Sequence, residues 1–162
     1  MNAIARGATP ALKVLADANV WHQVSTYDHL GSDAGFGQQA ATQLGIEPER
    51  IYKTLCVVTE TGHFVNAVIA VADMLHTKRL AAALKTKQVE MADPRVAQHK
   101  TGYVLGGISP LGQKLRARLV ADTSVYNHET MWVSAGRRGM SVEVRVQDFL
   151  LLTDATVAEI RR

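Results

Sequence analysis

The sequence contains a single cysteine, Cys56, so no disulfide can form within the chain. A chain without disulfides suits a reducing compartment, and we expect a cytoplasmic protein. A metal site is also disfavoured, because there is no cysteine pair and none of the six histidines lies at ligand spacing from another. The sequence therefore predicts a protein that works with neither a metal nor any other cofactor.

Long apolar runs are missing as well. No stretch of 18 or more apolar residues occurs, and residues 1–20 lack the apolar centre of a signal peptide, so we expect no membrane span and no leader. Disorder is disfavoured, because 47% of the 162 residues are apolar and 20% are charged. No repeat, low-complexity tract or linker divides the chain, and we expect one domain over residues 1–162.

The periodicity of the apolar residues predicts strands and helices in one mixed fold. Residues 51–58 and 64–71 read as two strands joined by a turn, and residues 131–146 read as a second hairpin. Strands are also expected at 20–27, 89–91 and 118–122, and helices at 9–19, 38–45, 77–85, 93–102 and 146–162. Because neighbouring strands form hairpins, we expect an α+β fold with a mixed, barrel-like curved sheet flanked by helices.

Lys53 lies inside the first of these apolar strands, which is an unusual place for a charge. Side chains alternate along a strand, so Lys53 should share a face with Leu55 and Val57. An unpaired buried ammonium group is costly, which favours a lysine that lines a pocket. A lysine that reaches from the strand end to solvent is the alternative, and from the strand pattern both stay open.

The sequence offers no convincing nucleophile. Cys56 falls on the opposite strand face from Lys53 and is expected to be a small core residue. Ser109 lacks the second glycine of a nucleophile elbow, and Pro110 has no N–H for an oxyanion hole. Gly106 and Gly107 could form an oxyanion-binding concavity with their N–H groups, although an ordinary turn is the alternative.

The formal net charge is +3, which permits a polyanionic partner without requiring one. Several basic residues come in small groups, and they form either a solvated surface or a rim that contacts phosphates. These residues are Lys78, Arg79, Lys85, Lys87, Lys114, Arg116, Arg118, Arg137 and Arg138.

A series of segments along nearly the whole chain resembles one family. In order they are "STYDH", "GFG" before "AATQLG", "IYKTLCV", "VEMAD", "TGYVLGGISPLGQKLR", "VSAGRRGMSVEV" and "QDFLLLT". Together they resemble the YbaK/EbsC family of aminoacyl-tRNA deacylases, close to its Cys-tRNA(Pro) deacylase branch. The resemblance implies a barrel-like sheet flanked by helices and an enzyme that edits mischarged tRNA(Pro) in trans, beside prolyl-tRNA synthetase. Editing is needed there because a proline pocket cannot exclude smaller side chains by size.

The resemblance also implies a site. Catalytic roles fall on Lys53, Gly106 and Gly107, with the lysine holding the aminoacyl end or terminal adenosine and the glycine N–H groups facing the ester carbonyl. Substrate-binding roles fall on Tyr27, Phe36, Thr54, Ser109 and Asp148.

The mechanism implied by the resemblance needs no protein nucleophile. In the cysteinyl branch the substrate's own thiol attacks its ester carbonyl, so the protein binds, orients and stabilises the developing oxyanion. Two alternatives stay open: a deacylase of the same fold that prefers Ala-tRNA(Pro), and a non-catalytic module that binds tRNA or the synthetase. Without the resemblance, the residues predict only a soluble mixed α/β domain, with a pocket at Lys53 as one of the two alternatives for that residue.

Overall fold

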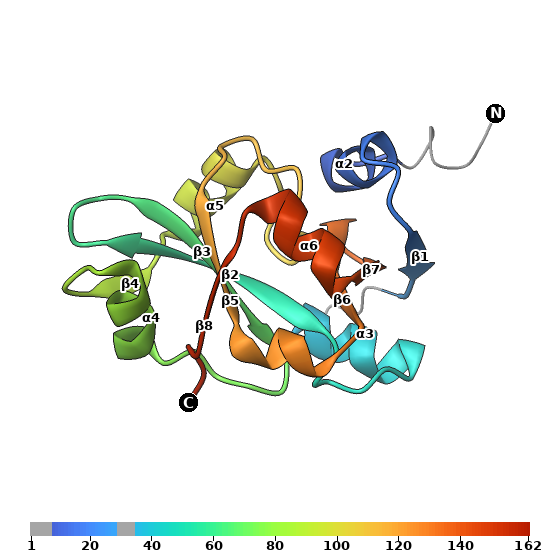
Figure 1. Cartoon of the computed structure of the whole chain (residues 1–162). Coiled ribbons are helices and arrows are strands. Elements are labelled where there is room, and N and C mark those ends of the chain that lie inside the picture. Colours follow the sequence, from blue (N-terminus) through green and yellow to red (C-terminus); the bar gives the residue numbers. More distant parts are fainter. Residues whose placement is uncertain (1–7, 29–34) are drawn as a thin grey trace.

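The computed structural model describes residues 8–28 and 35–162, which form two β-sheets and five α-helices (Figure 1). The smaller sheet has the strand order β1 (His22–Thr26), β7 (Met140–Arg145) and β6 (Thr130–Arg137), and all its strands are antiparallel. The predicted hairpin over residues 131–146 is confirmed as β6 and β7, with a register shift between Ser134 and Arg137.

The larger sheet is mixed. Its strand order is β4 (Val89–Met91), β2 (Tyr52–Thr59), β3 (Phe64–Ala70), β5 (Arg118–Asp122) and β8 (Thr156–Ala158). Strand β2 pairs antiparallel with β3 and β4, whereas β5 runs parallel to β3 and β8 runs parallel to β5. The hairpin predicted from residues 51–58 and 64–71 is therefore confirmed, and it turns at Gly62 with a φ of 88°.

The predicted α+β class is confirmed, but the sheets do not close into a barrel. Ile51 and Trp132 form an isolated bridge between the two sheets, and Trp132 N–H donates to the Arg50 carbonyl over 2.9 Å. Beyond this bridge β2 and β6 do not pair, and each belongs to its own sheet. A closed barrel would need β2 to pair along its length on both edges. Instead, one edge of β2 is left open near its start.

The helices begin and end close to their sequence signals. They are α2 (Pro10–Asp17), α3 (Phe36–Leu44), α4 (Thr77–Leu84), α5 (Pro94–Thr101) and α6 (Val146–Thr153), with a 3₁₀ turn η1 (Thr123–Asn127). The Thr9 side chain accepts the Leu12 N–H and the Asp93 side chain accepts the Arg95 N–H, as expected of N-caps. In the described part of the chain, no helix is both long and apolar enough to cross a membrane.

The predicted helix over residues 146–162 is wrong in its second half. Helix α6 ends at Thr153, and Asp154 follows in the left-handed region with a φ of 51°. Residues Thr156–Ala158 then form β8 beside β5. The buried Asp122 carboxylate accepts the N–H groups of Ile160 and Arg161, which fixes this segment in an extended form.

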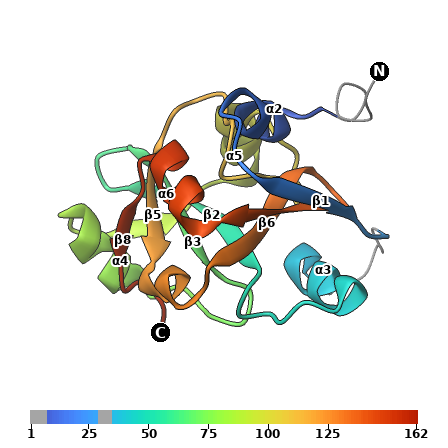
Figure 2. The same cartoon turned by 45° about the vertical axis from the view of Figure 1, so that its right-hand side comes forward.

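The larger sheet is buried on both faces, which explains the apolar run of β3. One face packs with α2, α6 and the smaller sheet, through residues such as Leu15, Val68 and Phe149. The other face packs on α4, through residues such as Ile69 and Leu80. Helix α3 packs against Trp132 and Ile51, where the bridge joins the two sheets, and Figure 2 shows the helix beside β1 and β6.

Candidate functional site

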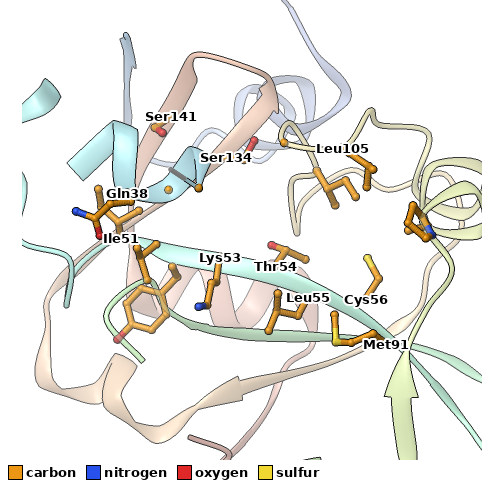
Figure 3. A pocket seen from close by; sticks show the side chains of 18 of the residues that line it. Gln38, Ile51, Lys53, Thr54, Leu55, Cys56, Met91, Leu105, Ser134 and Ser141 are labelled. Atoms are coloured by element: carbon orange, nitrogen blue, oxygen red, sulfur yellow. The ribbon is translucent and has the colours of Figure 1, made fainter. Parts of the chain in front are cut away.

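A cavity of about 710 Å³ lies along the open edge of β2. Its walls come from the start of α3, from β2 itself, from the segment that links β4 to α5, from the loop before β5 and from the β6–β7 hairpin (Figure 3). The lining is mostly apolar, with a few polar groups, as is typical of small-molecule sites. The residues that line it are Tyr27, Gly35, Gly37, Gln38, Ile51, Tyr52, Lys53, Thr54, Leu55, Cys56, Val71, Met91, Ala92, Pro94, Ala97, Leu105, Gly106, Ile108, Ser134 and Ser141.

The open edge of β2 presents peptide groups to this cavity. Strand β4 pairs with residues 57–59, and Ala92 N–H donates to the Cys56 carbonyl over 2.9 Å where this pairing ends. N–H and C=O groups two residues apart on a strand point to the same edge. The Thr54 peptide groups therefore point to the edge that β4 leaves uncovered. An uncovered strand edge can bind a ligand through backbone hydrogen bonds.

Lys53 supplies the only charge among the lining residues that the structure describes. Its Nζ donates a hydrogen bond of 2.9 Å to the backbone carbonyl of Asp73. Burial lowers the pKa of the Lys53 ammonium, and the nearby Asp73 carboxylate partly offsets this shift.

The side chains of β2 alternate as expected. Lys53 and Leu55 point to one side of the strand, and Thr54 and Cys56 point to the other side, toward Leu105 (Figure 3). The cavity thus wraps around the strand edge, with its charge on one side and the Leu105 loop on the other.

The two neighbouring glycines, Gly106 and Gly107, have different roles. Gly107 N–H donates to the Val104 carbonyl over 2.9 Å, and Gly106 adopts a φ of 83°, as in a type II turn. This turn already uses the Gly107 N–H as a donor, so the catalytic role expected of Gly107 stays a prediction. Gly106 lines the cavity, and its N–H has no acceptor among the described residues.

Gly107 is needed for packing. A Cβ added there would lie 2.9 Å from the backbone nitrogen of Arg138. The absence of a side chain lets the loop before β5 approach the β6–β7 turn closely. This contact holds the Gly106 wall of the cavity in place.

Tyr27 and Thr54 also line the cavity, as the sequence suggested for binding residues. Tyr27 is half-buried, its N–H donates to the Gly139 carbonyl over 2.8 Å, and burial raises the pKa of its hydroxyl. Phe36 begins α3, but its side chain lies outside what the structure describes. Its neighbours Gly35 and Gly37 are part of the lining.

Two expected binding residues lie outside the lining. Ser109 is fully buried, and its Oγ accepts the Leu111 N–H over 3.2 Å, so it shapes the loop instead of contacting a ligand. Asp148 lies in the first turn of α6, where a carboxylate stabilises the positive end of the helix dipole. Neither residue lines the cavity, so the binding roles that the sequence suggested for them are not supported.

The structure adds polar residues that the sequence reading did not select. Ser134 and Ser141 face each other across the β6–β7 pair and both line the cavity. Two serines at paired positions of otherwise apolar strands are the signal that could have identified them. Gln38, from the first turns of α3, is a further polar contributor.

Cys56 lines the cavity but is 6% exposed and packs with Phe64 and Ala97. Burial raises the pKa of its thiol to about 11. A thiol that stays protonated is a poor nucleophile. The prediction that Cys56 is a small core residue is thus confirmed by its packing.

Comparisons with known proteins place this cavity in a family. The family model described as an aminoacyl-tRNA editing domain matches residues 36–152. The chain belongs to this aminoacyl-tRNA editing family. Of the lining residues, the matched region contains all but Tyr27 and Gly35.

Individual relatives agree with this assignment. The chain is 38% identical over 133 residues to EbsC of Enterococcus faecalis, a candidate Cys-tRNA(Pro)/Cys-tRNA(Cys) deacylase, with 82% of this chain and 78% of that protein covered. It is 33% identical over 88 residues to a proline–tRNA ligase of Kosmotoga olearia, covering 54% of this chain and 15% of the ligase. A solved structure of a candidate trans-editing enzyme for prolyl-tRNA synthetase superimposes with a TM-score of 0.80 at 21% identity, over 100% of this chain and 99% of that chain, which shows a shared fold.

Proposed function

We propose that this editing-family chain is an aminoacyl-tRNA deacylase that releases cysteine from mischarged Cys-tRNA(Pro), and that residues 1–162 act as one domain in trans. The observation that carries the proposal is the cavity at the open β2 edge, which lies almost wholly within the family-matched region. The 38% identity to a candidate Cys-tRNA deacylase supports cysteine as the amino acid.

The composition of the cavity favours a reaction in which the substrate supplies the nucleophile. Among the described lining residues there is no histidine, aspartate or glutamate that could act as a general base for Ser134, Ser141 or Cys56. In the proposed step the cysteinyl sulfur forms a bond to its own ester carbonyl carbon. The carbonyl–ribose oxygen bond breaks, and the thiol proton ends on the departing ribose oxygen. The product is the four-membered thiolactone of cysteine, which water then hydrolyses to cysteine. No protein side chain is acylated.

The positions of the protein groups support the following proposed roles. The free Gly106 N–H stabilises the developing oxyanion, alone and not as a pair with Gly107. Lys53 binds the aminoacyl end or the terminal adenosine by charge, and the Thr54 peptide groups at the open edge hydrogen-bond the same ligand. Tyr27, which lines the cavity, is proposed to bind the same ligand, and the binding role expected of Phe36 stays a prediction.

The partners proposed are mischarged tRNA(Pro) and prolyl-tRNA synthetase. The match to a segment of a proline–tRNA ligase supports this association, because a related sequence occurs within that enzyme. The chain would act after the synthetase releases the mischarged product.

The test is deacylation of tRNA(Pro) charged with cysteine, alanine or proline. We expect rapid release of cysteine, little release of proline, and loss of cysteine release in Lys53→Ala. Faster cleavage of the alanyl ester would make alanine the substrate. Salt-sensitive tRNA binding without cleavage of any ester would replace the enzyme with a binding module.

A further inference from the structure

A second concave surface lies at the end of the larger sheet where β2 ends and β3, β4 and β5 begin. We call it the basic groove; its volume is about 1050 Å³. It is lined by the β2–β3 turn, the end of α4, the last turn of α5 and the start of β5. Figure 1 shows the β2–β3 turn between α4 and α5. Its charged residues are Glu60, Lys85, Lys87, Lys100, Arg116 and Arg118.

The groove concentrates the positive charge of the molecule. Five of the 18 lysines and arginines line it, with one of the 15 carboxylates. The remaining 13 basic and 14 acidic residues almost balance, so the groove accounts for the whole net charge of +3. Positive charges that are clustered on one concave surface create an attractive electrostatic potential for an anion.

The single carboxylate is already engaged. Glu60, in the β2–β3 turn, accepts hydrogen bonds from the Thr86 hydroxyl and from the N–H groups of Lys87 and Gln88. These bonds hold the loop after α4, where Lys85 adopts a left-handed φ of 58°. The carboxylate therefore positions the loop that carries Lys85 and Lys87.

None of the five basic side chains is paired. All five are exposed, and none forms an ion pair within residues 8–28 and 35–162. The ion pairs of the described residues, such as Lys13–Asp17 and Arg79–Glu159, all lie outside the groove. Five unpaired cations around one groove instead suit a ligand that carries several negative charges.

The groove lies close to the deacylase cavity. Cys56 lines the cavity and Thr59 lines the groove on the same strand, a separation of roughly 10 Å at the strand rise per residue. Helix α5 links the two sites as well, because Ala97 contacts the cavity and Lys100, one turn later, lines the groove.

From these observations we propose that the basic groove binds the phosphate backbone of the RNA whose aminoacyl end occupies the cavity. This inference rests on the proposed function and adds to it the surface that holds the nucleic acid. The groove contacts phosphates and not bases, because lysine and arginine supply charge from three of its four walls. Its two ring side chains are Phe64, which is 8% exposed, and His63, whose Nδ1 is hydrogen-bonded to the Thr61 hydroxyl. Neutralised single-strand phosphates each contribute about −0.7 to the slope of log affinity against log salt, so five contacts would give about −3.5.

The experiment compares two double charge reversals that change net charge equally. Lys87→Glu with Arg116→Glu reverses both flanks of the groove, whereas Lys78→Glu with Arg162→Glu reverses exposed residues outside its lining. Binding of uncharged tRNA is measured by fluorescence anisotropy across a salt series. We expect the groove variant to bind at least about tenfold more weakly, with a salt slope shallower by about 1.4, and the matched control to stay within about twofold.

A second experiment measures deacylation by the same variants. The groove variant should lose kcat/KM on full-length Cys-tRNA(Pro) while retaining the wild-type rate on cysteinyl-adenosine, which has no phosphate to contact. The milder double variant Lys87→Gln with Arg116→Gln should show the same pattern to a smaller degree. It replaces the charge-reversal variant in both experiments if that variant does not fold.

Equal tRNA binding by wild type and groove variant, or equal weakening in the control pair, would overturn the groove assignment. Failure of the proposed function gives a different result. In that case no charged tRNA is deacylated, yet uncharged tRNA still binds through the groove.

Discussion

The Nζ atom of Lys53 lies 2.9 Å from the backbone carbonyl oxygen of Asp73, and this hydrogen bond fixes the one charge among the described residues of the cavity lining. The ammonium group is thereby held in place before any ligand enters. Replacing Lys53 with alanine should lower kcat/KM for Cys-tRNA(Pro) by about 100-fold or more, as for loss of a preorganised charged donor. Single-turnover deacylation measures this effect, and Lys53→Arg should recover part of it. Wild-type activity in Lys53→Ala would remove the residue from the mechanism.

The carboxylate of Asp73 influences the pKa of the Lys53 ammonium group. Burial lowers the pKa of Lys53, and the Asp73 charge raises it again in part. Asp73→Asn keeps the backbone carbonyl but removes the charge, so the pKa of Lys53 should fall further. If protonated Lys53 binds substrate, the alkaline limb of the profile of kcat/KM against pH should move to lower pH. An unchanged profile would mean that the charge state of Lys53 does not limit the reaction.

The variant Gly107→Ala tests whether close packing at Gly107 stabilises the cavity wall. In Gly107→Ala the new Cβ would lie 2.9 Å from the Arg138 nitrogen, so the loop or the β6–β7 turn must move. We expect a loss of about 1–3 kcal/mol in the free energy of unfolding, together with lower deacylase activity. Urea denaturation measures the first effect. Gly35→Ala is the stability control, because no atom of the described residues lies within 4 Å of its added Cβ. Equal stability of the two variants would contradict this packing role.

Asp122 should stabilise the C-terminal segment in a pH-dependent way. Burial alone would raise its pKa, but hydrogen bonds from Ile160 and Ser124 and the charge of Arg161 outweigh it, so the pKa lies below its ordinary value. The stabilisation is present above the unfolded-state pKa of 3.8 and is lost as pH falls through the lower folded-state pKa.

Asp122→Ala should therefore cost about 3–5 kcal/mol near neutral pH, since it leaves the Arg161 guanidinium and three backbone N–H groups without their acceptor. Urea denaturation at pH 7 and at acidic pH measures this difference, which should shrink in acid. The exposed pair Lys13–Asp17 provides the control, and Asp17→Asn should have little effect at either pH. A deficit for Asp122→Ala that does not change with pH would show that the carboxylate charge is not its source.

The thiol of Cys56 should resist modification. Its pKa is raised from 9.0 to about 11 by burial, so at pH 8 its thiolate fraction should be about 100-fold smaller than that of an ordinary cysteine. Iodoacetamide labelling of the folded chain, followed by mass spectrometry, should be slow and should accelerate toward pH 11. The urea-unfolded chain is the reference and should react readily. Equal rates in the two states would mean that Cys56 is accessible and ionised.

Local signals predicted much of the secondary structure. Thr9, Asp93 and Gly102 marked helix ends correctly, and both long hairpins were identified from alternating apolar residues around glycine turns. The segment after Thr153 could not be assigned in this way. Its strand β8 depends on pairing with β5 and on the Asp122 carboxylate, and both partners lie more than 30 residues away in the sequence.

The cavity was only partly predictable. Lys53 stood out because an ammonium interrupts an apolar strand, and Gly106 stood out beside its glycine neighbour. Ser109 and Asp148 also belong to segments that resemble the family. Ser109 nevertheless supports its own loop, and Asp148 supports the start of α6. Motif membership brings residues near a site, but the direction of each side chain depends on the packing around it.

By itself the sequence determined the α+β class, most of the strands and helices, the buried character of Cys56 and the presence of a charge near the start of β2, because these follow from local propensity and alternation. Tertiary structure decided that the sheets stay open, that β2 exposes an edge at Thr54, that Gly107 donates within its own loop, and that five scattered cations line one groove. Those features depend on strand pairing and on contacts between residues far apart in the chain, which no local pattern encodes.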